Sequence, residues 1–113
     1  MSQGPADAGV AVVAHYQATA GHGDQVAALL GRHTAATRAE PGCREFVALR
    51  GTADPDSFTL YERYESRGAL ESHLASAHYA AIAVAQIRPL LADRTVEFCE
   101  IIPEDCGVAE EAG

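Results

Sequence analysis

The residues with the clearest chemical potential lie in the second half of the chain. His73 shares with Leu70 and Leu74 the spacing of one helical stripe, which predicts that its imidazole faces inward, towards a sheet. Because an imidazole titrates near neutral pH, His73 could act as a base or as a hydrogen-bond donor. The alternative is a structural histidine that Glu62 or a backbone carbonyl satisfies. The pattern leaves these two interpretations nearly balanced.

A carboxylate stands among apolar side chains on the alternating segment 58–65. The residues that share its face are Phe58, Leu60, Glu62 and Tyr64. A carboxylate in such a place is costly unless it is paired. The pattern favours an ion pair of Glu62 with Arg88 or Arg50 over a role in orienting His73. Tyr64 could stack against an aromatic ligand, or it could be a plain core tyrosine.

The spacing of His73 and His78 indicates whether the two could bind a metal ion together. On one continuous helix His73 and His78 would lie about 140° apart. Helical zinc sites use the i, i+4 spacing instead, so the pattern predicts no metal ion. For His78 we expect a capping or helix-breaking role first and contact with the mouth of a pocket second.

The elements that must position these residues follow the order β-α-β-β-α-β. Strands are expected at residues 10–16, 43–50, 58–65 and 95–102. The first helix, 24–39, carries the stripe Val26, Leu29, Leu30 and His33. A second helical pattern begins at the N-cap Ser66, resumes at Tyr79, and ends or kinks at Pro89. This order predicts an α+β, ferredoxin-like fold with a four-stranded antiparallel sheet, whose uncovered face a second sheet would bury.

Length and composition favour one small domain that pairs with a second copy. The chain has 113 residues and no Trp, and much of its apolar content is Ala, so a single core would be light. We expect one domain at residues 10–102 between flexible tails at 1–9 and 103–113. Three cysteines without metal-type spacing, and the lack of a leader, predict free thiols and a cytoplasmic location.

Charge excludes one class of partner. The formal net charge is −8, and the eight cationic side chains, all Arg, are scattered singly. Nucleic acid and anionic membrane surfaces both attract clustered cations, so neither is expected as a partner. No apolar run approaches the ~20 residues of a transmembrane helix.

Three segments resemble the antibiotic biosynthesis monooxygenase family. They are Glu40-Pro41-Gly42-Cys43, the strand from Phe58 to Ser66, and the helix from Ala69 to Tyr79. The resemblance covers about residues 10–102. It implies a homodimeric α/β barrel whose last strand reaches towards the partner, with a pocket between sheet and helices in each subunit. It also implies oxygenation of polyketide-like phenols or quinols to quinones by O2, without flavin, haem or metal.

Two departures from the family pattern narrow the range of activities that the resemblance implies. Members commonly carry Trp where Tyr64 stands, and the haem-degrading branch uses an Asn at the place of His15. Neither residue is present, so haem cleavage is not expected. The family that the chain resembles also contains members that act on a signalling-molecule phosphate.

The resemblance then suggests roles for particular residues. His73 is expected to be the base, with Tyr64 and His15 as orienting donors, although His15 could face the dimer interface instead. The expected substrate-lining residues are Phe46, Phe58, Glu62, His78, Tyr79 and Ile82. Two alternatives stay open: a non-catalytic dimeric module that binds a small aromatic molecule or serves in stress, and an isomerase-type activity on a small oxygenated metabolite.

Overall fold

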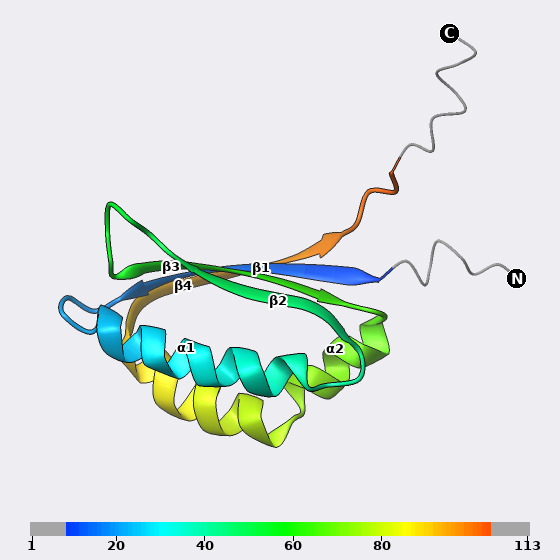
Figure 1. Ribbon diagram of the computed structural model, residues 1–113, viewed down its shortest axis with the longest axis horizontal. Helices are drawn as coiled ribbons and strands as arrows, with labels where there is room; N and C mark the ends of the chain where they lie inside the picture. Colours follow the sequence, from blue (N-terminus) through cyan, green and yellow to red (C-terminus); the bar gives the residue numbers. More distant parts are fainter. Residues whose placement is uncertain (1–8, 105–113) are drawn as a thin grey trace, which may run out of the picture.

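The computed structural model describes residues 9–104, which form a four-stranded antiparallel sheet with all helices on one face (Figure 1). In chain order the elements are β1 (Val10–Ala18), α1 (Gly23–Arg38), β2 (Cys43–Arg50), β3 (Ser57–Tyr64), α2 (Arg67–Leu74), the π-helical segment η2 (Tyr79–Ile87), the 3-10 turn η3 (Arg88–Leu90) and β4 (Leu91–Glu100). The sheet order is β2-β3-β1-β4. The predicted α+β, ferredoxin-like class is therefore confirmed. The predicted tails fall mostly outside the described residues.

The two faces of the sheet differ as the alternation predicted. On β3 the side chains of Phe58, Leu60, Glu62 and Tyr64 are all buried beneath the helices. On β1, Ala14 and Tyr16 are buried in the same layer, whereas His15 between them is exposed. His15 pairs in register with Thr59 of β3 and its ring nitrogen Nδ1 lies 3.2 Å from Thr59 Oγ1. Both residues belong to the outer face of the sheet, away from the helices.

The turn after α1 brings the end of that helix close to α2. Helix α1 buries the stripe that includes Val26 and Leu30, and it ends just before the segment Glu40-Pro41-Gly42. A side chain at position 42 would collide with the Cβ of Ala69 in α2. Only glycine therefore permits this approach, and the approach sets Glu40 beside α2.

The second helical region is interrupted. Ser66 caps α2 by accepting a hydrogen bond from the Ala69 amide at 3.1 Å, as predicted. Helix α2 ends at Leu74, and the chain continues as the wider η2. The Ser76 hydroxyl bridges the break, since it donates to the His73 carbonyl at 2.7 Å and accepts from the Tyr79 amide at 3.2 Å. Beyond η3, which holds Pro89, strand β4 starts at once, four residues earlier than predicted.

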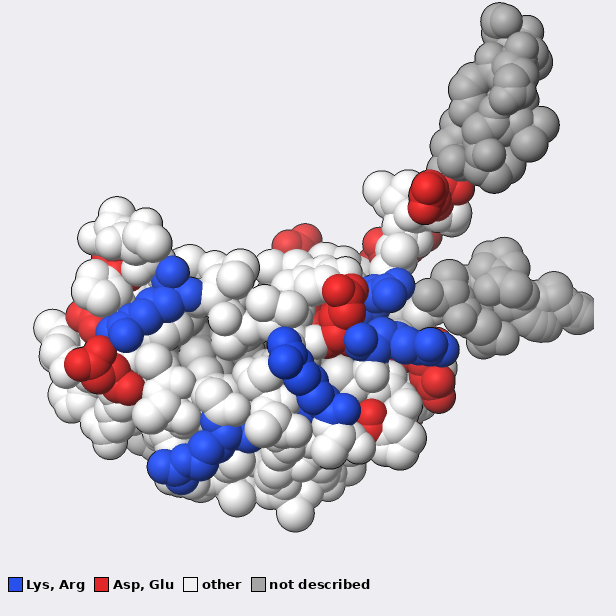
Figure 2. Space-filling model, in the orientation of Figure 1, with Lys and Arg blue, Asp and Glu red and all other residues white. Residues whose placement is uncertain are grey.

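Charged side chains lie mainly on the surface. The arginines visible in Figure 2 form no continuous stripe, and several lie beside carboxylates. Three such ion pairs join Arg63 to Glu45, Arg44 to Glu65, and Arg50 to Asp24, at 3.1, 3.4 and 2.8 Å. Exposed pairs of this kind stabilise a fold little. Within residues 9–104, every helix is too short or too polar to cross a membrane.

Candidate active site

His73 lies at the C-terminal end of α2 with its side chain buried. Its Nδ1 atom is 2.8 Å from Oε2 of Glu40. Because an ionised carboxylate can only accept, we assign the proton to Nδ1, which donates to Glu40. The Nε2 atom of the neutral ring then keeps its lone pair. His73 is thus oriented as a base.

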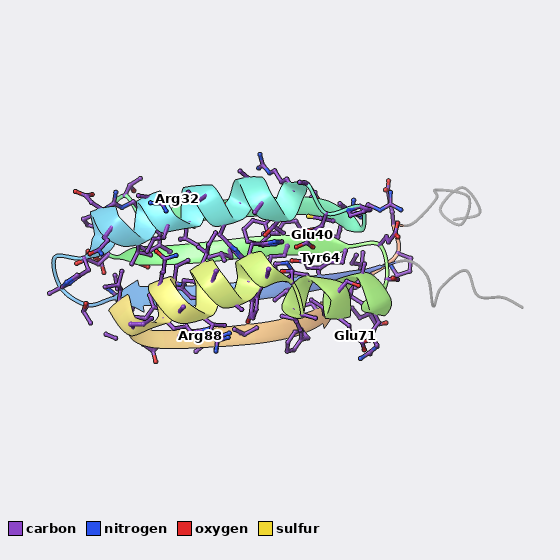
Figure 3. The ribbon with its side chains drawn as sticks, turned by 90° about the horizontal axis from the view of Figure 1, so that it is seen from below. Arg32, Glu40, Tyr64, Glu71 and Arg88 are labelled. Atoms are coloured by element: carbon purple, nitrogen blue, oxygen red, sulfur yellow. The ribbon has the colours of Figure 1, made fainter. Side chains whose placement is uncertain are left out.

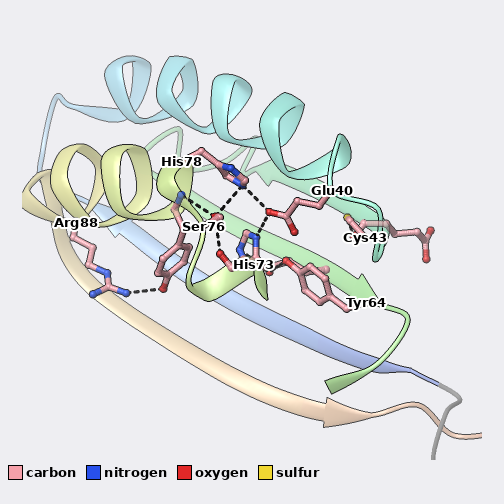
Figure 4. A network of polar contacts seen from close by, with 10 residues as sticks. Glu40, Cys43, Tyr64, His73, Ser76, His78 and Arg88 are labelled. Carbon is pink, nitrogen blue, oxygen red and sulfur yellow. Dashed lines mark hydrogen bonds and ion pairs between the residues drawn. The ribbon is translucent and has the colours of Figure 1, made fainter. Parts of the chain in front are cut away.

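Glu40 binds a second histidine with the same oxygen atom. Nε2 of His78 lies 2.6 Å from Glu40 Oε2 and 3.3 Å from Ser76 Oγ. Figure 4 shows both imidazoles pointing at this carboxylate from opposite sides of the break between α2 and η2. Seen from the helix side, Glu40 and Tyr64 lie between α1 and the second helical region (Figure 3). One carboxylate therefore joins the end of α1 to the second helical region.

Glu62 is buried on β3 and accepts a hydrogen bond from the Tyr64 hydroxyl at 2.6 Å. Its Oε1 atom lies 4.0 Å from Nε2 of His73. The predicted ion pair with Arg88 or Arg50 is wrong, because Arg88 donates to the Tyr79 hydroxyl and Arg50 pairs with Asp24. The arginine whose charge acts on Glu62, lowering its pKa, is Arg94 on the wall of the same cavity. The structure instead places Glu62 beside His73, which was the alternative interpretation.

The titration behaviour of these groups follows from their burial. Burial raises the pKa of Glu62 from 4.5 to about 7, and the hydrogen bond from Tyr64 opposes that rise. Burial lowers the pKa of His73, and the Glu40 carboxylate opposes that change. An ion pair would shift both pKa values the other way. The 4.0 Å contact between His73 and Glu62 is therefore not a salt bridge near neutral pH.

A third histidine, His33 of α1, packs against the other two. Its ring centroid lies 5.5 Å from that of His73, 5.6 Å from that of His78, and 5.5 Å from that of Phe46. Burial and the two neighbouring imidazoles lower the pKa of His33 to about 4. Its buried Nδ1 atom has no hydrogen-bond partner among residues 9–104. His33 is therefore a neutral histidine with an unused polar atom.

A cavity of about 50 Å³ lies between the sheet and the helices, next to His73. Its lining residues are Val12, Ala14, Tyr16, His33, Leu60, Glu62, Leu70, His73, Leu74, Tyr79, Arg94, Val96 and Phe98. A larger, open groove of about 650 Å³ runs between α2 and the end of β4. Leu70, Leu74 and Phe98 border both spaces, so these three side chains form the wall between the cavity and the groove.

The structure brings together some of the predicted site residues and separates others. His73, Glu62 and Tyr79 line the cavity. Tyr64 is not one of the lining residues, and its hydroxyl donates to Glu62. His78 contacts Glu40. Phe46 and Phe58 belong to the buried core cluster and Ile82 packs against it, and none of the three lines the cavity. The expected donor role of His15 in this cavity is wrong for a single chain, because His15 lies on the opposite face of the sheet.

Sequence reasoning missed two residues of the site. Glu40 was quoted only as part of a motif, and His33 was counted as one position of an apolar stripe. A carboxylate directly before Pro41-Gly42 at a helix end was the available signal for Glu40. For His33 the signal was a polar residue on an otherwise apolar stripe, which is the same signal that singled out His73.

The fold and site define a class: a ferredoxin-like domain with a histidine and carboxyl group in a cavity between its sheet and helices. The model of the antibiotic biosynthesis monooxygenase family matches residues 9–85, so the chain belongs to that family. Rv0793 of Mycobacterium tuberculosis, a protein named for a proposed monooxygenase activity, is 41% identical over 70 residues, which are 62% of this chain and 68% of that protein.

Solved structures agree with this assignment. The structure of Rv0793 has a TM-score of 0.77 and 33% identity over 85% of this chain and 97% of that one. A structure described as an antibiotic biosynthesis monooxygenase has a TM-score of 0.77 and 27% identity, covering 83% of this chain and 99% of that one. PA3566 from Pseudomonas aeruginosa, with a TM-score of 0.80 and 21% identity over 87% and 98% of the two chains, supports the fold alone.

Proposed function

We propose that the protein is a cofactor-independent monooxygenase that oxidises a small, electron-rich phenol to a quinone with O2. The family supplies the class of reaction. The observation that carries the finer proposal is the orientation of His73, whose Nδ1 is bound by Glu40 at 2.8 Å while the ring lines the cavity. This arrangement leaves Nε2 available to take a phenolic proton.

The chemistry balances without an external reductant. His73 takes the phenolic proton, and the resulting phenolate is electron-rich enough to reduce O2. A carbon–oxygen bond then forms at the ring, the O–O bond of the peroxide breaks, and water leaves. The substrate loses two hydrogen atoms and gains one oxygen atom, and the second oxygen atom of O2 leaves as that water. Glu62, with a pKa of about 7, is placed to donate a proton to the peroxide.

A ring can enter only if the wall of the cavity moves. A cavity of about 150 Å³ accepts benzene, so about 50 Å³ is too small for a phenol. Leu74 and Phe98, which are 41% and 63% exposed, separate the cavity from the open groove. We propose that the substrate ring displaces these two side chains and reaches His73 from the groove.

We also propose that two copies pair through the outer face of the sheet. On this face Val13 and Leu49 are 36% and 53% exposed, and Leu49 shares a row with Thr59 and His15. Burying apolar side chains stabilises association. In light scattering, Leu49→Arg should convert a dimer to a monomer, whereas Val84→Arg, which adds the same charge to η2, should not. A monomeric wild type would refute the pairing.

Oxygen uptake by the purified protein, against a panel of phenols and quinols, tests the catalytic proposal. Uptake that matches quinone formation and is lost in His73→Ala supports it. Saturable binding of the same compounds without uptake would instead favour a non-catalytic binding module. Product that forms equally well without air would favour an isomerase.

A further inference from the structure

Three potential metal ligands converge between the end of α1 and the second helical region. They come from three segments: Glu40 from the turn after α1, His73 from α2, and His78 from the residue before η2. One ligand atom of each residue lies within 4.8 Å of the other two. Both histidine nitrogens meet a single carboxylate oxygen, at 2.8 and 2.6 Å (Figure 4).

We infer that Glu40, His73 and His78 form a binding site for one divalent transition-metal ion, of which zinc is the simplest example. Two imidazole nitrogens and one carboxylate oxygen are a donor set that suits zinc and its first-row neighbours. The spacing of His73 and His78 along the chain had counted against such a site. That objection assumed one continuous helix, and the break at Ser76 removes it.

The distances require only a small adjustment. Ligand atoms about 2.0–2.1 Å from a tetrahedral ion lie about 3.3 Å from one another. The contact of Glu40 with His73 must therefore open by roughly 0.5 Å and its contact with His78 by roughly 0.7 Å. The two histidine nitrogens, which lie within 4.8 Å of each other, must reach the same spacing. Glu40 lies in the turn after α1, outside any helix or strand, so rotation of its side chain can supply this change.

A further buried group stands beside the cluster without a partner. The ring of His33 packs against both histidines, and its Nδ1 atom makes no hydrogen bond to any residue of 9–104. An ion held by three protein ligands keeps a fourth position for water. His33 therefore supplies, beside the cluster, a polar atom that no contact among residues 9–104 uses.

The Nδ1 atom of His73 lies 2.8 Å from the Glu40 carboxylate, so Nδ1 is the atom that would bind the ion. A histidine binds a metal ion through the lone pair of a nitrogen that carries no proton. Binding through Nδ1 then moves the proton of His73 from Nδ1 to Nε2, with no change in charge.

This change of tautomer has a consequence that rests on the proposed function. With a metal ion on Nδ1, the Nε2 atom of His73 carries a proton and faces Glu62 as a donor. His73 can then no longer accept a proton from a phenol. The metal-loaded protein should be inactive as a monooxygenase, and a chelator should restore activity.

The competing interpretation is a plain hydrogen-bond network around Glu40, and the variant Glu40→Gln separates the two. An amide oxygen can still accept hydrogen bonds from both histidines, but it is a poor ligand for zinc. The experiment uses the untagged full-length chain, stripped of metal, and titrates it with Zn²⁺ by calorimetry and with Co²⁺ by visible absorption. His22→Asn, which removes an exposed histidine, and Cys43→Ser are the matched controls.

We expect one ion per chain, with affinity reduced on the order of 100-fold or more in Glu40→Gln and His78→Asn and unchanged in both controls. The cobalt spectrum should lack a thiolate charge-transfer band. Failure of the wild type to bind at millimolar zinc would overturn the inference. So would binding that Glu40→Gln leaves intact but His22→Asn or Cys43→Ser removes. Because these readouts need no substrate, they stand apart from the test of the catalytic proposal.

Discussion

Glu62 should make the stability of the fold depend on pH, and Glu62→Gln should remove that dependence. Glu62 is 7% exposed as a whole residue, and burial raises the pKa of its carboxyl group from 4.5 to about 7. The unfolded chain releases this proton near pH 4.5, whereas the folded protein keeps it until about pH 7. The contribution of Glu62 to stability is therefore complete below pH 4.5 and is lost as the pH rises towards 7.

The size of this loss follows from the difference in pKa. A difference of one in pKa corresponds to about 1.4 kcal/mol, so the wild type should lose about 3 kcal/mol relative to Glu62→Gln across that range. The glutamine can still accept the hydrogen bond from Tyr64, which keeps the comparison local to the charge.

Urea unfolding of both proteins at a series of pH values measures the effect. Glu71→Gln, which removes an exposed carboxylate from α2, reports the influence of net charge alone. A free-energy difference between wild type and Glu62→Gln that stays constant from acid to neutral pH, after that correction, would refute the assignment of a raised pKa.

Three further results are expected. If His73 is the base, kcat/KM should rise with pH through a pKa below 6.5, the ordinary value for histidine. The variant Glu62→Gln should keep this rise. A rise near pH 7 that Glu62→Gln abolishes would instead make Glu62 the base. His33→Leu should reduce the loss of stability on acidification from pH 6.5 towards pH 4 by up to about 3 kcal/mol, because the folded state resists protonation of His33; equal acid sensitivity in urea unfolding would contradict this. Ser66→Ala should destabilise the protein by about 1 kcal/mol through loss of the cap on Ala69, and an unchanged thermal midpoint would count against that role.

The fold was predictable because its signals are local. The alternation around Glu62 placed it correctly on the buried face of β3, and Ser66 marked the start of α2. The start of β4 was placed too late because the residues after Pro89 show little alternation. Their strand character comes from pairing with β1, which a local pattern does not contain.

The site was predictable only in part, because its contacts join segments far apart in the sequence. His73 and Glu62 were found from their places on inward faces. Glu40 lies 33 residues before His73, and its contact depends on the close approach of Gly42 to α2. Likewise, Arg88 and Arg50 were predicted as partners of Glu62 only because their charges are opposite to that of a carboxylate. The side chains that contact Glu62 are those of Tyr64 and His73.

The most direct test of the central claim is a single reaction under ¹⁸O2, with wild type and His73→Ala compared on the best phenol of the panel. The account predicts a quinone that carries one labelled oxygen atom, one labelled water for each turnover, no released peroxide, and loss of about 100-fold or more in rate in the variant. An unlabelled quinone with stoichiometric hydrogen peroxide would show that the protein removes electrons without inserting oxygen. That result, or full activity in His73→Ala, would contradict the proposed mechanism.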